Sequence, residues 1–256
     1  MISFISTYSK DKAISERDAI QTFFQVILLK NIAFENARLI GGTALVLGHS
    51  NPRFSEDIDL SNVEDPFYLR KSIEKGANEI AQWMNCSFKI KPPTKATRTW
   101  KTTFSLGHGP SINLHVDSQP NKTFTNLPIV ISYPGIAPFI FPSVSVEEIM
   151  ADKVLALALR NYVGGRDLFD LWNHWLRHEN IKSIEMTVMK LLPKKLSQRG
   201  ISDYDLFVEI RNRLKKGLPD RVLTEWERYL PSGLKKKEIF KEIYNCVTRY
   251  FETVRI

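Results

Sequence analysis

Apolar and polar positions follow one another with two different periods along the chain. In the first part, a period of 3.6 residues predicts helices over Ile14 to Lys30 and Pro66 to Asn85. A period of two residues, bounded by turn residues, predicts short strands at Ala37 to Ile40, Asp57 to Ser61, Phe88 to Pro92, Arg98 to Leu106, Ser111 to Ser118 and Ile129 to Ser132. We also expect Thr43 to cap a short helix that ends at Leu47.

The pattern changes near Phe141 and Pro142, and from Ser143 onward it is almost entirely helical. The expected helices are Val146 to Arg160, Asp167 to His178, Ile181 to Leu192, Asp203 to Lys215, Arg221 to Tyr229 and Lys235 to Val254. We therefore predict an α+β protein. Residues 1–142 would form a mixed sheet flanked by helices, and residues 143–256 an all-helical domain that completes the active site and the acceptor surface.

The composition is that of an ordinary globular protein of 256 residues, with 43% hydrophobic and 25% charged residues. No stretch approaches the roughly 18 apolar residues of a membrane span, so we expect no membrane association. The apolar run Phe23 to Leu29 follows charged residues and does not resemble a signal peptide, which predicts a cytoplasmic protein. Cys86 and Cys246 lack metal-ligand spacing and are expected to be reduced thiols.

Basic residues outnumber acidic ones by 36 to 28, which gives a net charge of +8. Such a field attracts polyanions such as RNA and nucleotides, although a basic surface without any partner has the same composition. One segment combines five basic residues with two aromatic ones, a mixture that suits single-stranded nucleic acid and equally any exposed face: Lys89, Lys91, Lys95, Arg98, Lys101, Trp100 and Phe104.

The strongest local feature is a glycine turn followed by a pair of carboxylates. Gly41 and Gly42 end a strand, where their backbone can approach a phosphate and the next helix start can bind it, with Thr43 adding a hydroxyl. Asp57 and Asp59 share one face of the next strand, and two such carboxylates favour a divalent cation, Mg²⁺ (or Mn²⁺), together with substrate phosphates. Alternatively, both are solvated residues of an edge strand.

These residues carry a family resemblance. Gly41-Gly42-Thr43-Ala44-Leu45 followed by Arg53, Ser55 and Glu56-Asp57-Ile58-Asp59-Leu60 resembles the first motif of the AbiEii/AbiGii-type toxin nucleotidyltransferases, within the DNA polymerase β-like superfamily. The resemblance, which runs from about Arg38 to Trp172, implies a nucleoside triphosphate (NTP) as substrate. It also implies nucleotide contacts by Arg53 and Ser55, and a toxin–antitoxin system of the abortive-infection type with an antitoxin encoded nearby.

A third acidic residue from a neighbouring strand is common in this superfamily. Alternation places Asn113, His115 and Asp117 on one face of the expected strand, and Asp117 could complete a metal site or act as a base toward an acceptor hydroxyl. The family pattern puts its acidic residue nearer His115, which is a departure. The alternative to a role for Asp117 in the site is a half-exposed strand with a polar outer face.

A lysine interrupts the apolar stripe of the helix that follows the capping box at Ser145 and Glu148. Burying the ammonium of Lys153 is costly unless an anion meets it. That anion would be a triphosphate or an internal carboxylate such as Asp170, or the side chain would reach out to solvent.

The same family has a later motif of a helix bearing a lysine and then Arg-Asp-x-x-Asp-Leu. In this chain the matching residues are Lys153, Arg166, Asp167 and Asp170, with Arg166 and Asp170 spaced as neighbours on a helix. The resemblance implies that Lys153 and Arg166 contact the triphosphate and that Asp167 or Asp170 orients the lysine or an acceptor. The alternative is a structural network of arginine and aspartate, and we expect Asp170 to be structural and Asp167 catalytic.

Two functions follow from these features. The first is a Mg²⁺-dependent nucleotidyltransferase toxin (type IV-like) that moves a nucleotide from an NTP to an acceptor, with the 3′ end of tRNA as the acceptor known for some relatives. Asp57, Asp59, Lys153 and Asp167 would be its catalytic residues. The second is a degenerate transferase domain that binds RNA or a protein. A transferase acting on a protein hydroxyl, or one that moves a phosphoryl group, would use the same metal site.

Overall fold

The computed structural model describes residues 3–32, 36–94, 96–107, 109–202, 205–217 and 220–254. The chain folds into two compact units. The first comprises Met1–Ser50 and Phe54–Val144, and the second comprises Asn51–Arg53 and Ser145–Ile256. The three residues Asn51–Arg53 thus interrupt the first unit and belong to the second, an exchange that no sequence pattern indicated.

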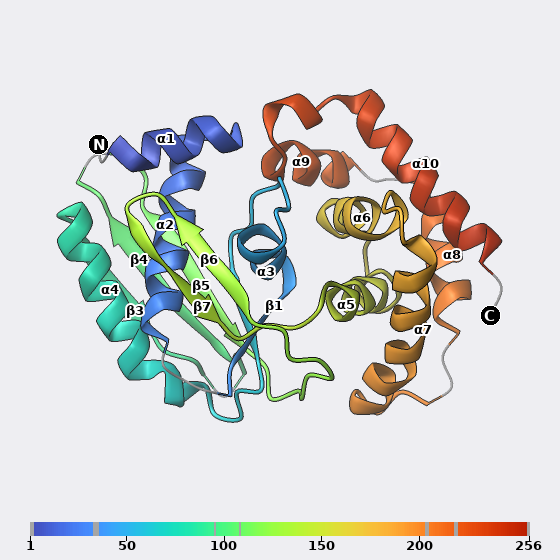
Figure 1. Cartoon of the computed structure of the whole chain (residues 1–256), viewed down its shortest axis with the longest axis horizontal. Coiled ribbons are helices and arrows are strands. Elements are labelled where there is room, and N and C mark those ends of the chain that lie inside the picture. Colours follow the sequence, from blue (N-terminus) through green and yellow to red (C-terminus); the bar gives the residue numbers. More distant parts are fainter. Residues whose placement is uncertain are drawn as a thin grey trace. The chain divides into compact units, whose positions relative to one another are not determined.

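The first unit is built on a five-stranded mixed sheet with the order β1-β2-β5-β4-β3 and a separate hairpin of β6 and β7 (Figure 1). The main strands are β1 (Arg38–Ile40), β2 (Ile58–Ser61), β3 (Ser87–Lys91), β4 (Thr99–Ser105) and β5 (Ile112–Ser118). The hairpin comprises β6 (Ile129–Tyr133) and β7 (Ile136–Phe141). Among the strand pairs that the structure describes, β2 and β5 run parallel and the others are antiparallel. This arrangement, followed by a helical second unit, confirms the predicted α+β class.

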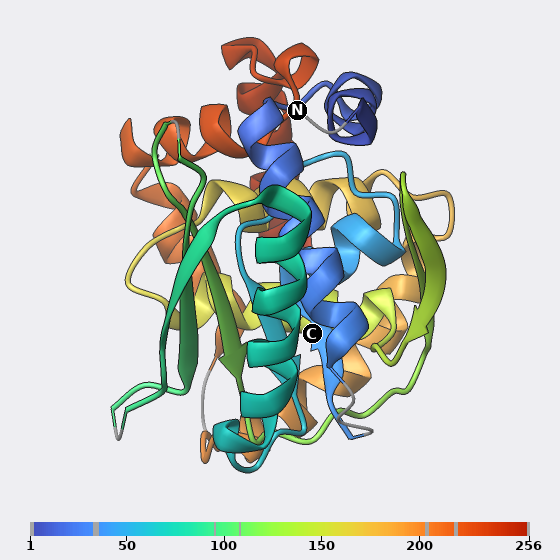
Figure 2. The same ribbon diagram turned by 90° about the vertical axis from the view of Figure 1, so that its left-hand side faces the viewer.

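The helices of the first unit pack against the sheet or against one another. They are α1 (Ser3–Lys12), α2 (Glu16–Asn31), α3 (Gly41–Gly48), the 3₁₀ turn η1 (Pro66–Leu69) and α4 (Arg70–Met84). Figure 2 shows α2 and α4 side by side along the sheet. The Phe24 ring of α2 lies 4.6 Å from the Phe104 ring of β4, so this face carries the core. The other face of β3, β4 and β5 is therefore left to polar side chains.

The regular elements in the described part of the second unit are all helical. It contains α5 (Val146–Leu159), α6 (Gly165–Leu171), the π-helical turn η2 (Trp172–Leu176), α7 (Ile181–Gln198), α8 (Leu206–Lys215), α9 (Asp220–Tyr229), η3 (Ser232–Leu234) and α10 (Lys237–Thr253). Its core includes two fully enclosed tryptophans, Trp175 and Trp226. No helix in the described ranges of the chain is long and apolar enough to cross a bilayer.

Several boundaries differ from the sequence-based expectations. Helix α2 begins at Glu16 instead of Ile14 because the hydroxyl of Ser15 caps it by accepting the amide N–H of Asp18. The expected start of α5 at Val146 is confirmed, and the hydroxyl of Ser145 caps the helix by accepting the N–H of Glu148. Helix α7 continues past the expected end at Leu192 and contains Pro193. The expected helix from Asp203 begins at Leu206, and positions 203 and 204 lie outside the described residues.

The sequence predicted neither the first helix nor the last strand, and it did not predict the short turn η3. Helix α1 has a weak apolar pattern, and strand β7 lacks regular alternation because Ala137 and Pro138 are both exposed. The proline is tolerated because a two-stranded hairpin has free edges that need no ladder hydrogen bond.

Candidate active site

The two aspartates of the first motif lie at the start of β2, the strand between β1 and β5. Asp57 directly precedes the strand, which begins at Ile58 and not at Asp57 as expected, and Asp59 is its second residue. Ile58 and Leu60 are fully buried, whereas both aspartates are partly exposed. The alternation of β2 therefore presents the two carboxylates on the open face of the sheet, as its two-residue period predicted.

A third carboxylate stands directly beside Asp59. In the parallel pairing of β2 and β5, Asp59 is the Cα partner of Asp117, and neighbouring strands lie about 4.8 Å apart. The hydroxyl of Thr99, the next residue across on β4, donates a hydrogen bond to Oδ1 of Asp117. Like charges directly opposite each other on a sheet repel. A divalent cation between Asp59 and Asp117 would relieve this repulsion.

His115 completes the group of polar side chains around Asp57. Its Nδ1 atom lies 3.2 Å from Oδ1 of Asp57, and both side chains are a little over one-third exposed, at 37% and 36%. The sequence placed His115 on the same face as Asp117 but assigned it no role. Its position next to Asp57 depends on the β2–β5 register, which links residues nearly sixty positions apart and has no local signature.

Gly41 brings the glycine turn against this carboxylate group. It directly follows Ile40, the cross-strand partner of Asp59, and its φ of +70° is in the left-handed region. A Cβ atom at Gly41 would lie 2.5 Å from Oδ2 of Asp59. Any other residue would therefore be strained and would collide with the carboxylate, which explains why glycine stands here.

Thr43 takes a different part from the expected one. Helix α3 begins at Gly41 with Ile40 as its cap residue, so Thr43 lies inside the helix and does not cap it. Its hydroxyl is fully buried, donates to the carbonyl oxygen of Asp57 and lies 3.1 Å from Oγ of Ser55. Gln25 of α2 donates to the carbonyl oxygen of Ser55 at 3.0 Å. In this structure Thr43 and Ser55 position the backbone of Asp57 from inside the core.

The second unit contains a buried ion network around Asp170 of α6. Arg53 donates two hydrogen bonds to this carboxylate, from Nε at 2.6 Å and from Nη2 at 2.8 Å, and Asn51 donates a third at 2.7 Å. The side chains of Arg53 and Asp170 are only 2% and 0% exposed. Arg53, expected at the nucleotide, is therefore an internal partner of Asp170 in this unit.

Lys153 of α5 joins the same network. Its Nζ atom lies 2.7 Å from Asp167 and 3.0 Å from Asp170, and Asp167 also accepts from Arg160 at 2.7 Å. Of the anions considered from the sequence, the internal carboxylate is thus the one that meets this lysine.

The pKa values of the network show how strongly its charges are coupled. Burial alone would lower the pKa of Lys153, but the charges of Asp167 and Asp170 outweigh it and raise that pKa above its ordinary value. Burial would likewise raise the pKa of Asp170, yet Arg53 and Lys153 hold it far below its usual range. Both groups therefore stay charged at neutral pH because each has its counter-ion.

Arg166 does not join this network. Its Nε atom lies 2.9 Å from Glu225 of α9, and its guanidinium stacks over the ring of Tyr229 at 4.4 Å. Arg166 and Asp170 share α6 with the predicted spacing, but they have different ion partners: Asp170 pairs with Arg53 and Lys153, and Arg166 pairs with Glu225 of α9. The amide of Gly165 also donates to Glu225, at 2.6 Å, which fixes the start of α6.

The residues of the first unit fit a magnesium ion better than any softer metal. Within the part of the chain that the structure describes, no three His, Cys, Asp or Glu side chains converge on one point in a way that would hold a metal ion alone. Mg²⁺ does not need such a cage, since it is usually held by one or two carboxylates and completed by substrate phosphates and water. Asp57 and Asp59, with Asp117 beside them, supply this kind of oxygen donor on an open face.

Comparisons with known proteins agree with this picture. The family model described as nucleotidyl transferase AbiEii toxin, type IV TA system, matches residues 24–246. Among solved structures the chain is similar to JHP933 from Helicobacter pylori, with 18% identity, 93% of this chain and 91% of that chain covered, and a TM-score of 0.52. It is also similar to a candidate nucleotidyltransferase from H. pylori, with 17% identity, coverage of 95% and 100%, and a TM-score of 0.53. These identities show a shared fold. No curated protein matches the chain.

Proposed function

The chain belongs to the AbiEii family of nucleotidyl transferase toxins of type IV toxin–antitoxin systems, and on this basis we propose that it transfers a nucleotide from an NTP to the 3′ end of an RNA, with tRNA as the acceptor. The observation that carries the proposal is the meeting of Asp57, Asp59 and Asp117 with the glycine bend at Gly41 on the open face of one sheet.

The carboxylates have the chemistry to bind the magnesium form of the nucleotide. Asp57 and Asp59, with Asp117, would hold Mg²⁺ (or Mn²⁺). When bound, this ion would neutralise part of the negative charge of the phosphates. The residues themselves contribute the rigidity of the site: Thr43 holds the backbone of Asp57, and Thr99 holds the side chain of Asp117.

The glycine bend has the geometry for the triphosphate. The amide N–H groups at the start of α3 bind anions favourably because they lack partners within the helix and lie at its positive end. With no Cβ at Gly41, the backbone can come close to phosphate oxygens beside Asp59.

The transfer itself would be an in-line displacement. The acceptor hydroxyl loses its proton, its oxygen bonds to the α-phosphorus, and the bond to the departing pyrophosphate breaks. Asp117 is the carboxylate that we assign to receive the proton, because it stands on the β5 side of Asp59, away from the glycine bend.

In this proposal the ion network of the second unit holds its own side chains, including Lys153 and Asp167, in place. Lys153, Asp167 and Arg53 are each satisfied by internal partners in this structure. Contact of Lys153, Arg53, Arg166, Ser55 or Thr43 with the nucleotide stays a prediction, and for Lys153 it would require exchanging a carboxylate for a phosphate.

The biological setting follows from the family and from the charge. The net charge of +8 favours a polyanionic acceptor such as RNA. A type IV system implies an antitoxin as partner. We propose that the toxin acts in the cytoplasm, where NTPs and tRNA occur, and that its activity contributes to abortive infection.

The test is transfer by the purified full-length chain, with magnesium or manganese and each of the four NTPs labelled at either the α- or the γ-phosphate. Purified tRNA, total RNA and cellular protein are offered separately as acceptors. We expect α-label on tRNA and no γ-label, with loss of transfer when EDTA is added. Label only on protein, γ-label on any acceptor, or no transfer with any combination contradicts the proposal, and the last result would leave a binding module.

A further inference from the structure

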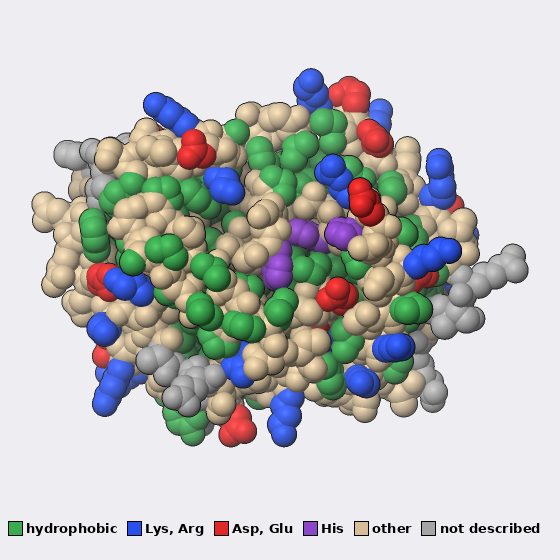
Figure 3. Space-filling model, in the orientation of Figure 1, with side chains coloured by type: hydrophobic (Ala, Val, Ile, Leu, Met, Phe, Trp, Pro, Cys, Tyr) green, Lys and Arg blue, Asp and Glu red, His purple; other side chains and the backbone are tan. Residues whose placement is uncertain are grey.

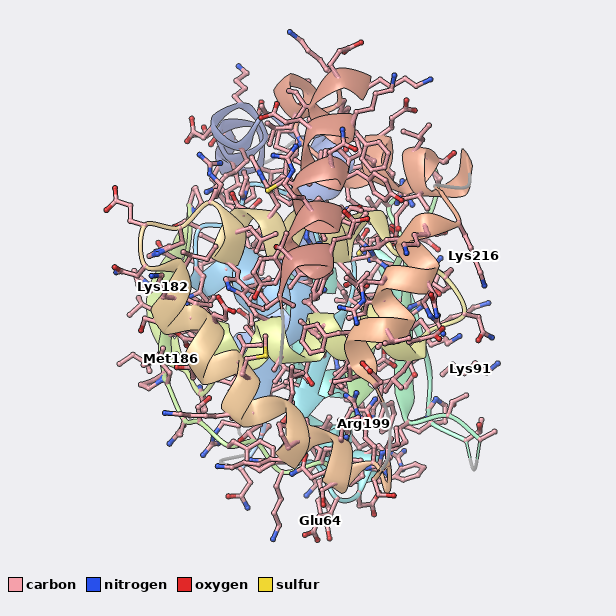
Figure 4. The ribbon with its side chains drawn as sticks, turned by 90° about the vertical axis from the view of Figure 1, so that its right-hand side faces the viewer. Glu64, Lys91, Lys182, Met186, Arg199 and Lys216 are labelled. Carbon is pink, nitrogen blue, oxygen red and sulfur yellow. The ribbon has the colours of Figure 1, made fainter. Side chains whose placement is uncertain are left out.

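The open face of the sheet continues beyond the carboxylates to a pair of lysines. On β3 and β4 the exposed positions include Lys91 and Lys101, while Phe88 and Phe104, a partner pair elsewhere on the same two strands, turn to the core face. Alternation therefore places both lysines on the face that carries His115, Asp117 and Asp59. Figure 4 labels Lys91 and shows its side chain extending outward.

The strand register aligns these residues into one line across the sheet. Lys91 is the Cα partner of Lys101, and Lys101 is the Cα partner of His115, whose ring contacts Asp57. We call Lys91 and Lys101 the lysine row. The lysine row lies in line with the carboxylates. Lys101 is on β4, two strands from β2, and Lys91 is on β3, three strands from β2.

The lysine row places two positive charges directly opposite each other, an arrangement that destabilises a sheet unless an anion intervenes. Neither lysine has an ion pair anywhere in the described ranges of the chain. By contrast, Lys153 and Lys195 of the second unit are each met by two carboxylates. The lysine row is thus a site where a ligand anion would remove an unfavourable repulsion.

The order of the strands indicates which anion would bind at the lysine row. Across the sheet, the glycine bend follows β1, the carboxylates stand on β2 and β5, and the lysine row stands on β4 and β3. A triphosphate over the bend and the lysine row are therefore on opposite sides of Asp59. At about 4.8 Å per strand the backbone of Lys91 is roughly 14 Å from β2, a distance that suits a further part of the acceptor.

We propose that the lysine row binds backbone phosphates of the RNA acceptor, a few nucleotides upstream of the end that reacts. The proposal rests on the transferase function proposed above. Recognition here is by charge and not by base stacking, because Trp100 and Phe104, the aromatics of this segment, are buried at 2% and 0% exposure. The adjacent Thr103 and Asn113 are neutral and bond to each other at 2.8 Å. Binding is therefore tolerant of sequence.

The first measurement is the salt dependence of binding of a fluorescent single-stranded RNA to the full-length chain, without NTP. Losing two phosphate contacts lowers the steepness of log K against log salt by about 1.4, at roughly 0.7 per phosphate of a single strand. The variant carrying Lys91→Glu and Lys101→Glu should therefore lose roughly sevenfold less affinity than the wild type between 50 and 200 mM salt, since about 1.4 powers of a fourfold change are at stake.

Matched variants identify the cause. Lys71→Glu removes an exposed lysine of α4 in the same unit and should keep the wild-type salt slope. Lys91→Arg with Lys101→Arg keeps the charges and should also keep the slope. Lys91→Gln with Lys101→Gln removes them without adding acidity and should lower it, and circular dichroism of each variant checks that the fold is retained.

The second measurement separates this proposal from the function on which it rests. In steady-state transfer, the double glutamate variant should raise KM for RNA while leaving KM for the NTP unchanged. Transfer to RNA by the wild type with unchanged slope and KM for RNA in that variant overturns the lysine row and leaves the function standing. A lysine-dependent slope without any transfer by the wild type overturns the proposed function and leaves the lysine row as an RNA-binding site. A raised KM for the NTP, or lysine-dependent transfer to a protein instead of RNA, also overturns the assignment.

Discussion

Each unit contains a group of aspartates, and the two groups differ in what surrounds them. In the first unit, Asp57 and Asp59 are partly exposed on an open sheet face, beside a glycine and a third aspartate. In the second, Asp167 and Asp170 are almost fully enclosed by Lys153, Arg53 and Arg160. The negative charge is balanced internally in the second group, whereas the first has carboxylates side by side.

This difference suits the two groups to different roles, which substitutions in each group would test. Buried charges must be paired within the protein, so the network around Asp170 is explained by its own members. Carboxylates that lie opposite each other on a partly exposed sheet face repel, and a bound cation would relieve that repulsion. Figure 3 shows why total charge is a weaker guide, since lysine and arginine side chains are dispersed over the face that it presents.

The sharpest way to test the comparison is to neutralise one aspartate of the open face. Asp59→Asn should reduce nucleotide transfer on the order of 10³–10⁴-fold, because several kcal/mol of charge stabilisation is lost at 1.36 kcal/mol per tenfold. Its midpoint of thermal unfolding should change little, because the side chain of Asp59 is partly exposed. Retained transfer would show that these carboxylates are ordinary solvated residues.

Removing one aspartate of the buried network should have the opposite profile. Asp170→Ala leaves Arg53 and Lys153 without their shared counter-ion and should lower the free energy of unfolding by about 3–5 kcal/mol. Urea unfolding of the full chain measures this, with Glu179→Ala, a change at an exposed residue of the same unit, as the control. A loss below that of the control would mean that the network is not structural.

The glycine bend should be sensitive to a single methyl group. Gly41→Ala must adopt a left-handed backbone, at about 1–2 kcal/mol, and must also push Asp59 away. We expect a modest loss of stability together with a large loss of transfer, measured on the same preparation. The matched change Gly107→Ala also has a positive φ but meets no neighbour within 4 Å, so it should cost stability alone. Equal activity of the two variants would contradict a role for the bend.

Part of the pH dependence of stability should come from Asp170 of the second unit. Because the folded pKa of Asp170 lies below its unfolded value of about 3.9, its contribution is present above that pH and is lost as the pH falls toward the folded pKa. The loss can reach about 1.4 kcal/mol per pH unit below about pH 4. The difference between wild type and Asp170→Asn in urea unfolding isolates it, and a difference independent of pH would be the contrary result.

The sequence alone predicted those parts of the site that depend on local periods. The two-residue period placed Asp57 and Asp59 on one face, and the helical period placed Lys153 among apolar residues where only an anion could accompany it. It also named Asp170 as one candidate for that anion, a pairing now seen at 3.0 Å.

The rest depends on contacts between distant segments. The hydroxyl of Thr43 could bond a phosphate, a cap or the carbonyl of Asp57, and only the packing of α3 against the following loop selects among them. Arg53 and Asp170 are 117 positions apart, so no local pattern could pair them. The burial of Trp100 likewise follows from which face α2 and α4 cover.

The excursion of Asn51–Arg53 into the second unit has a consequence for dividing this polypeptide. A fragment that begins at Ser145 would lack Arg53 and Asn51, which donate hydrogen bonds to Asp170 of α6. A fragment that stops at Val144 would contain both donors but lack their acceptor. Each half expressed alone should therefore be less stable than the same part of the intact chain, whereas a nick in an exposed surface turn elsewhere would leave these three hydrogen bonds intact.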